Sequence, residues 1–219
     1  MITLREDQEK ARADLRVALR MFYAVLLFAP TGFGKTVLMA ALINLIIASG
    51  KKVIICLHRV DLITQTATPL DQFGIRYSYI AAGRHHNIYA PVQIASIPTL
   101  QNRLGKYDGY DYVFVDEAHL SMGAGWARTI SHYKTLGRKI IGLTGSPERL
   151  DGKPLGAGWD TMVMGPSTRW LIEQGHLSTY RAFAPAGIDL SGVHTRNGDF
   201  VSSEIDEIMS GKAVLSGAV

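Results

Sequence analysis

Short apolar runs alternate with longer segments of helical hydrophobic spacing through most of the chain. The apolar runs lack the polar alternation of a half-exposed sheet, and they occupy residues 24–29, 53–57, 92–96, 112–115 and 139–143. Segments typical of helices lie between them, at residues 35–48, 60–73, 97–104 and 127–136. This order predicts a three-layer α/β domain with a mostly parallel central sheet.

The two ends of the chain differ from this pattern. Near the N-terminus, Thr3 followed by Glu6 is typical of a helix start, and apolar positions at helical spacing predict a helix over residues 4–19. After Gly156 glycines become frequent, and only one short helix is predicted, at residues 169–173. We therefore predict one α/β domain over residues 1–165 and an extension or linker over residues 166–219.

Composition narrows the class of protein. The 219 residues include 47% hydrophobic ones, enough for a sizeable core, and a net charge of +4 suits a polyanionic partner without requiring one. The single cysteine, Cys56, lies in an apolar run, so disulfides and cysteine-based zinc sites are excluded. The N-terminus lacks a secretory signal, and the longest apolar stretch, residues 37–48, is shorter than the roughly 20 residues of a membrane span. A cytoplasmic protein without membrane contact is expected.

The strongest motif is a glycine-rich loop between an apolar run and a predicted helix. Its sequence is Ala29-Pro30-Thr31-Gly32-Phe33-Gly34-Lys35-Thr36. Glycines let backbone N–H groups surround phosphate oxygens, Lys35 can reach the terminal phosphates, and the Thr36 hydroxyl can ligate magnesium. The strict pattern begins with glycine, where this chain has Ala29. The alternative is an ordinary strand-to-helix turn in which Lys35 and Thr36 are incidental.

A pair of carboxylates follows another apolar run. Asp116 and Glu117 come directly after residues 112–115, and His119 lies two positions further on. In open α/β sheets the carboxyl ends of strands are where ligands bind. This position predicts that Asp116 holds magnesium and that Glu117 orients and deprotonates a water attacking a γ-phosphate, while His119 couples the nucleotide to neighbouring loops. An acidic, solvated helix N-terminus is the alternative.

Together these two motifs resemble the DEAH-box branch of superfamily 2 helicases, in particular the bacterial and phage group related to type III restriction and repair helicases. The resemblance covers about residues 4 to 180 and implies a RecA-like P-loop NTPase fold that takes ATP and Mg²⁺. Nucleotide binding is then expected from Thr31, Gly32, Phe33, Gly34, Lys35 and Thr36. The stretch beginning at Leu4 is similar to the family's adenine-contacting element, which implicates Arg5 and Gln8; a plain amphipathic helix start is the other interpretation.

Further stretches resemble the family's nucleic-acid and coupling motifs in the same order. Arg59, Ser96 and Thr99 are implied to contact a single-strand backbone, although a solvated loop at Arg59 and a helix N-cap at Ser96 explain the same residues. Thr144 and Ser146 occupy the motif that connects hydrolysis to strand movement. Gly145 stands there where the family usually has alanine, which loosens the backbone.

The resemblance also implies a partner domain. Superfamily 2 motors bind ATP between two RecA-like domains, and the second supplies arginines that neutralise the transferred phosphoryl group. We therefore expect an ATP hydrolase with weak or no turnover alone, which acts on nucleic acid, with single-stranded or forked DNA favoured over RNA. The alternative is a module that uses ATP as a switch for binding nucleic acid or a partner, without motor activity.

Overall fold

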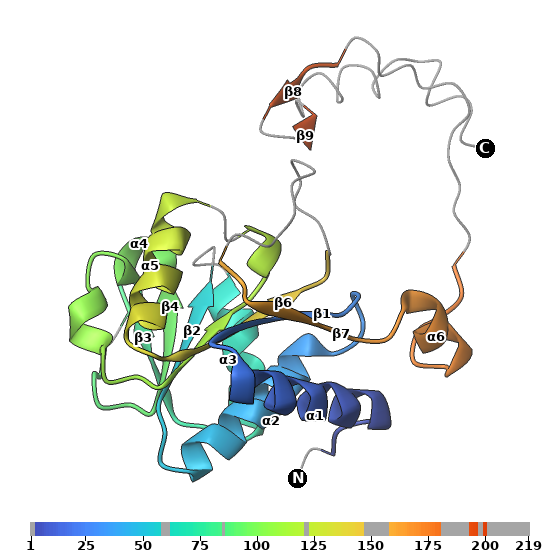
Figure 1. Cartoon of the computed structure of the whole chain (residues 1–219), viewed down its shortest axis with the longest axis horizontal. Coiled ribbons are helices and arrows are strands. Elements are labelled where there is room, and N and C mark those ends of the chain that lie inside the picture. The colour runs from blue at the N-terminus through green and yellow to red at the C-terminus, as the bar shows by residue number, and fades with distance from the viewer. Residues whose placement is uncertain are drawn as a thin grey trace.

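A seven-stranded parallel sheet forms the centre of the protein, with helices on both faces (Figure 1). The computed structural model describes residues 3–57, 62–84, 86–120, 123–146, 158–180, 193–196 and 199–200. The strands are β1 Ala24–Phe28, β2 Val53–Leu57, β3 Tyr77–Ile80, β4 Val92–Ser96, β5 Tyr112–Val115, β6 Lys139–Thr144 and β7 Thr161–Met164. Their order is β3-β4-β2-β5-β6-β1-β7, and every neighbouring pair is parallel. The predicted three-layer α/β fold is confirmed.

Two groups of helices enclose the sheet. The helices are α1 Glu6–Met21, α2 Lys35–Ala48, α3 Leu62–Gln72, α4 Ile97–Leu100, α5 Ala124–Thr135 and α6 Thr168–Glu173, with 3-10 turns η1 Leu104–Tyr107 and η2 Ala118–Leu120. Buried residues of α1, α2, α3 and α6 pack in one core, while those of α4, η1 and α5 pack in the other. A separate antiparallel pair joins β8 Thr195–Arg196 to β9 Asp199–Phe200. Of the described helices, none is long and apolar enough to cross a bilayer.

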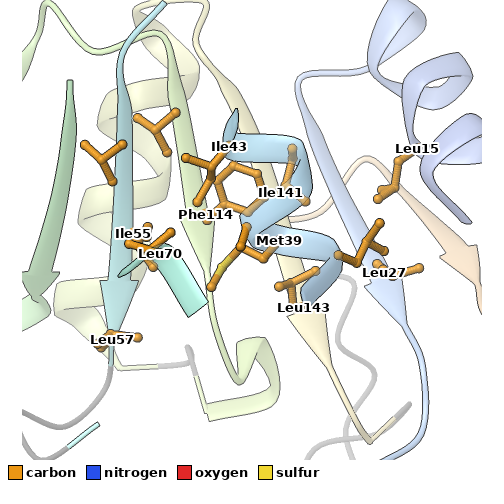
Figure 2. Close-up of a cluster of buried hydrophobic side chains, with 14 of the residues drawn as sticks. Leu15, Leu27, Met39, Ile43, Ile55, Leu57, Leu70, Phe114, Ile141 and Leu143 are labelled. Atoms are coloured by element: carbon orange, nitrogen blue, oxygen red, sulfur yellow. The ribbon is translucent and has the colours of Figure 1, made fainter. Parts of the chain in front are cut away.

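Alternate side chains of each central strand enter opposite cores. In β2, Ile55 packs in the core beneath α2, whereas Ile54 packs in the core beneath α5. Figure 2 shows how Met39 and Ile43 of α2 lie against Phe114. Fully burying such side chains stabilises a fold by about 1.5–3 kcal/mol each. Because both faces of these strands are buried, their sequences are continuous apolar runs.

The departures from the sequence predictions occur at edges and ends. The two strands of the main sheet that the hydrophobic pattern did not predict, β3 and β7, are four-residue edge strands with only part of each strand buried, so neither forms an apolar run. The short strands β8 and β9 outside this sheet were not predicted either. The predicted 97–104 helix is wrong in extent, because α4 ends at Leu100 and η1 begins at Leu104. The first helix begins at Glu6 with Arg5 as its N-cap, so Thr3 does not cap it; the Gln8 side chain instead accepts a hydrogen bond from the Arg5 N–H.

Strand order brings the predicted motifs to one edge of the sheet. The neighbouring strands β5, β6 and β1 end at Val115, Thr144 and Phe28. The ends of β5 and β1 precede the two segments expected to bind and hydrolyse ATP, and the end of β6 lies in the segment expected to couple hydrolysis to strand movement. Next to β5 come β2 and β4, whose carboxyl ends precede the segments expected to contact nucleic acid. Because parallel strands share one direction, all five ends lie on the same side of the domain.

Candidate nucleotide-binding site

The glycine-rich loop adopts backbone angles that its glycines make possible. Gly32 and Gly34 both have φ of 85°, a conformation that side chains with a Cβ rarely adopt. Gly34 is the N-cap of α2, so Lys35 and Thr36 form the first two positions of the helix. Phe33 is completely buried and fastens the loop to the core. The result is a loop whose backbone turns directly into a helix N-terminus, the geometry that favours anions.

The Lys35 side chain folds back across this loop. Its Nζ donates to the carbonyl oxygens of Ala29, at 2.8 Å, and Pro30, at 3.3 Å. Burial lowers the pKa of Lys35, while the negative charges of Glu117 and Asp116 act in the opposite direction. A Cβ added to Gly145 would lie only 3.3 Å from the Lys35 Nζ, which shows that Gly145 lies beside the ammonium group. Lys35 is therefore a partly desolvated cation enclosed by the segments after β1, β5 and β6.

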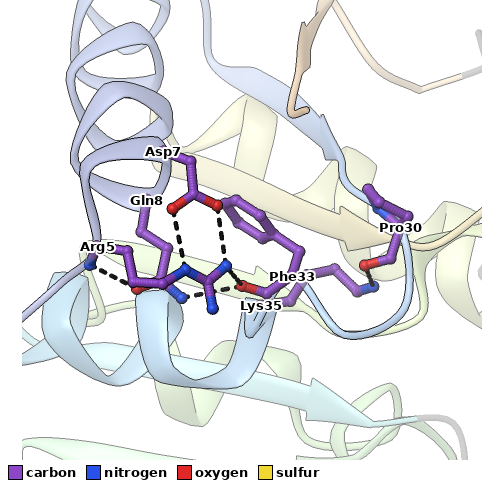
Figure 3. Close-up of polar contacts among 6 residues, drawn as sticks. All are labelled: Arg5, Asp7, Gln8, Pro30, Phe33 and Lys35. Atoms are coloured by element: carbon purple, nitrogen blue, oxygen red, sulfur yellow. Dashed lines mark hydrogen bonds and ion pairs between the residues drawn. The ribbon is translucent and has the colours of Figure 1, made fainter. Parts of the chain in front are cut away.

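Arg5 and Gln8 hold the loop from the side of α1, as Figure 3 shows. Both side chains donate to the Phe33 carbonyl oxygen, Arg5 Nη2 at 2.8 Å and Gln8 Nε2 at 2.9 Å. Asp7 fixes the guanidinium through two further bonds of 3.0 and 2.9 Å. Burial works to raise the pKa of Asp7, but the hydrogen bond and charge of Arg5 bring it below the usual value. The structure thus places both residues against the glycine-rich loop, and their contact with adenine stays a prediction.

The carboxylates Asp116 and Glu117 follow β5 on a sharply turned backbone. The Asp116 N–H donates to the Cys56 carbonyl oxygen at 3.2 Å, which aligns the turn with the end of β2. Glu117 has φ of 48°, the one positive value among described residues other than glycine, and its N–H donates to Asp116 Oδ1 at 3.0 Å. Burial, and then the charge of Glu117, raise the pKa of Asp116. Holding two carboxylates here costs stability, which is typical of a functional site.

Because ionised Asp116 lowers the free energy of unfolding, we predict that Asp116→Asn stabilises the ligand-free protein. A raised native pKa means that the folded state binds the proton more tightly than the unfolded state, so ionisation lowers stability as pH rises through that native pKa. Asparagine has the same shape and never ionises. We expect a Tm at pH 7.5 that is higher by about 2–4 °C, equivalent to about 1 kcal/mol. Thermal unfolding should show the gain shrink toward pH 4, and an unchanged or lower Tm at pH 7.5 would contradict the expectation.

His119 links the carboxylates to the end of β6. Its Nδ1 lies 3.3 Å from Glu117 Oε2 and 3.1 Å from Thr144 Oγ1. The Thr144 hydroxyl donates to the Ser146 carbonyl oxygen at 2.9 Å, so its hydrogen is used and His119 must donate through an Nδ1–H. Thr144 also accepts, through its own carbonyl oxygen, from the Ala29 N–H at 3.0 Å. A continuous set of contacts therefore connects the carboxylate turn with the phosphate loop.

Leu177 touches the glycine-rich loop, a contact that the sequence pattern did not predict. Its side chain packs on Gly32, where an added Cβ would lie 2.3 Å from a Leu177 methyl carbon. Leu171 of α6 is completely buried in the core that also contains Leu27 of β1. The segment around α6 thus covers one side of the loop. A leucine close to a glycine of the loop leaves no local pattern in the sequence, so this contact was found only in the structure.

The predicted nucleic-acid residues are only partly placed. Ser96 is buried, stands at the N-cap of α4 without capping it, and donates instead to Thr99 Oγ1 at 3.0 Å. Thr99 is partly exposed and lies at the surface end of this pair. Arg59 falls outside the described residues. The three residues therefore remain predicted contacts, with Thr99 the more accessible of the two that are described.

The two predicted metal ligands, Thr36 and Asp116, suit a small hard cation, but other ligands must complete its coordination shell. Thr36 and Asp116 offer a hydroxyl and a carboxylate, which suit Mg²⁺. Among the described residues, no group of three or more His, Cys, Asp or Glu side chains could hold a metal ion by itself. A magnesium ion at this site would therefore take its remaining ligands from phosphate oxygens and water.

The chain matches one family model and one curated relative. Residues 1–149 match the model of the type III restriction enzyme, res subunit. A 51.5 kDa protein from a Lactococcus phage (isolate 7-9) is 25% identical over 191 residues, which are 87% of this chain and 39% of the phage protein. The chain thus spans less than half the length of that relative.

Solved structures share the fold at low sequence identity. The UvsW helicase from bacteriophage T4 has a TM-score of 0.63 and 21% identity, over 74% of this chain and 60% of that one. The Type ISP restriction-modification enzyme LlaGI, a nuclease-deletion mutant in complex with a DNA substrate mimic, has a TM-score of 0.66 and 13% identity, over 80% and 21%. The Pyrococcus furiosus Hef helicase domain has a TM-score of 0.57 and 20% identity, over 74% and 40%.

Proposed function

Because this chain belongs to the type III restriction enzyme res subunit family and has the RecA-like fold of superfamily 2 helicases, we propose that it binds Mg-ATP at the loop after β1 and drives movement along nucleic acid. The observation that carries the proposal is the convergence on Lys35. Its ammonium is enclosed by the ends of three neighbouring strands and interacts electrostatically with Asp116 and Glu117. A partly buried cation beside two carboxylates suits the terminal phosphates of a nucleotide with its metal ion.

Each residue then has a distinct task. The backbone from Gly32 to Thr36 surrounds the phosphates, and Lys35 exchanges its bonds to the Ala29 and Pro30 carbonyls for phosphate oxygens. Thr36 and Asp116 would hold Mg²⁺, which supplies charge neutralisation at the phosphates when bound. Glu117 orients the attacking water and accepts its proton.

Through its contacts with Glu117 and Thr144, His119 would respond to the presence or loss of the γ-phosphate. Glu117 shares the Nδ1–H of His119 with Thr144, so a change at the carboxylate shifts hydrogen bonding at the end of β6. Thr144 reaches Ser146 on one side and Ala29 on the other. We propose that hydrolysis is coupled to nucleic-acid contacts through this set of residues.

Efficient turnover needs a cationic group beyond those described in this site. Arg5 is the described arginine that contacts the phosphate loop, and its guanidinium is bound to Asp7 and to the Phe33 carbonyl. An arginine that stabilises the transferred phosphoryl group is worth about 10³–10⁵ in kcat. We propose that a second RecA-like domain supplies it, so that this chain alone binds ATP well and hydrolyses it slowly.

The test is to measure nucleotide binding and turnover on the same preparation. A fluorescent ATP analogue should bind in a magnesium-dependent manner, and hydrolysis should stay at least about a thousandfold below that of a complete two-domain motor, with or without single-stranded DNA. Absence of ATP binding would refute the proposal. Strong DNA-stimulated hydrolysis by this chain alone would refute the need for a second domain, whereas an ATP-dependent gain in DNA affinity without turnover would favour a switch.

A further inference from the structure

A surface hollow lies on the opposite side of the sheet from α1, between η1 and the outer face of α5. Its volume is about 750 Å³, and it is separate from the ATP site, because none of the residues that form that site line it. We call it the η1–α5 hollow and define it by its lining residues, Gln101, Asn102, Arg103, Leu104, Gly105, Lys106, Arg128, Ser131 and His132.

The lining of the η1–α5 hollow is cationic. Arg103, Lys106 and Arg128 are all exposed, and no acidic residue is among the lining residues. Within the described part of the chain, neither Lys106 nor Arg128 forms an ion pair. The nearby carboxylate of Asp108 is already bonded to His132 Nε2, at 2.7 Å. Three cationic side chains thus gather around a concave surface that attracts a polyanion.

The other lining residues favour phosphate over a peptide. Gln101, Asn102 and Ser131 offer amide and hydroxyl groups, which are common hydrogen-bond partners of phosphate oxygens. Leu104 is the one large apolar residue of the lining, and it is buried rather than available to a partner. A protein partner would need apolar or aromatic anchor pockets, which this lining does not offer.

We propose that the η1–α5 hollow is a second binding site for the sugar-phosphate backbone of nucleic acid, where it holds the part of a DNA substrate next to the strand engaged by the motor. The proposal rests on the proposed function, because Ser96 and Thr99 lie at the N-cap and within α4, next to the end of β4, and the chain runs from α4 through Gln101 into the hollow. A DNA segment in contact with Thr99 therefore has a cationic surface along its onward path.

The experiment replaces Arg103, Lys106 and Arg128 together by glutamine in the full chain. Binding to a forked DNA is measured by fluorescence anisotropy between about 50 and 200 mM salt, where each phosphate contact contributes about 0.9 to the slope of log K against log salt. We expect the slope to fall by about 2 to 3 and the affinity at the lowest salt to fall at least about tenfold. Magnesium-dependent ATP binding should equal that of the unmodified chain, which reports intact folding.

A control with the same change of charge separates a local site from overall charge. Arg12, Arg16 and Arg20 lie on α1, whose buried residues pack in the other core, and their triple replacement by glutamine also removes three positive charges. This control should keep most of the salt slope. Equal losses in both triple variants would overturn the proposal, as would an unchanged slope in the hollow variant.

Two further outcomes distinguish this inference from the proposed function. If the unmodified chain binds ATP but no forked DNA, the nucleic-acid part of the proposed function fails and the hollow proposal with it. If the hollow variant binds DNA normally but loses binding to poly-glutamate, the hollow takes an acidic protein segment and only the present proposal is overturned.

Discussion

Lys35→Ala is expected to remove most of the affinity for Mg-ATP. The Lys35 ammonium is partly buried next to Asp116 and Glu117, and phosphate oxygens would replace its two bonds to loop carbonyls. Truncating one member of a desolvated charge pair costs about 2–5 kcal/mol, which corresponds to a loss of about 30-fold to several-thousand-fold in Kd. Titration with a fluorescent ATP analogue in magnesium measures this loss directly.

The matched control for this substitution is Lys10→Ala. Lys10 is exposed on α1, where it pairs with Asp14 one turn away, so it carries the same charge without contacting the loop. Its replacement should leave Kd within about twofold, since exposed pairs contribute little. A Kd for Lys35→Ala that stays within threefold of the unmodified chain would remove Lys35 from the phosphate site.

The central part of the fold was predictable because its strands are buried on both faces. Runs such as Val53–Leu57 contain no polar position, and the helices between them are long enough to show a period of 3.6. The edge strands carry a weaker signal. In β3 only alternate residues are buried, and in β7 Val163 is the one buried residue, so neither run is distinguishable from a loop in the sequence.

The candidate site was predictable only where chemistry and chain position coincide. Gly34 and Lys35 stand where the loop after β1 enters α2, and the Asp116-Glu117 pair follows β5 directly, so local sequence gives both their residue type and their place. Contacts between distant segments leave no such trace. Gln8 reaches the Phe33 carbonyl from another element, and Leu177 reaches Gly32 across more than a hundred residues of chain. Such contacts depend on how helices pack, which periodicity does not specify.

The start of α1 supports the glycine-rich loop from outside, through side chains that lie far from the loop in the sequence. Arg5 and Gln8 both end on one carbonyl oxygen of the phosphate loop, and the buried Asp7 carboxylate keeps the guanidinium in place. A hydrogen bond from a charged group such as the Arg5 guanidinium contributes about 1.5–3 kcal/mol, and one from a neutral amide such as Gln8 about 0.5–1.5 kcal/mol. The start of α1 therefore fixes the loop before any ligand arrives. The family resemblance pointed to these two residues for contact with adenine, which stays a prediction, whereas their hydrogen bonds to the loop were found only in the structure.

Glu117→Gln is expected to lower ATP turnover by about a hundredfold to ten-thousandfold while ATP binding persists, because it removes the carboxylate that we propose as the acceptor of the proton from water. Glutamine keeps the size of the side chain, and its Oε1 still accepts from the Nδ1–H of His119, so the link to Thr144 is retained. Steady-state hydrolysis gives the rate and a fluorescent ATP analogue gives the affinity.

Glu173→Gln, which alters an exposed carboxylate paired with Arg169 on α6, is the matched control and should leave both the rate and the affinity unchanged. Turnover in Glu117→Gln within fivefold of the unmodified chain would assign the proton acceptor elsewhere, whereas loss of both turnover and binding would mean that Glu117 supports the loop rather than the reaction.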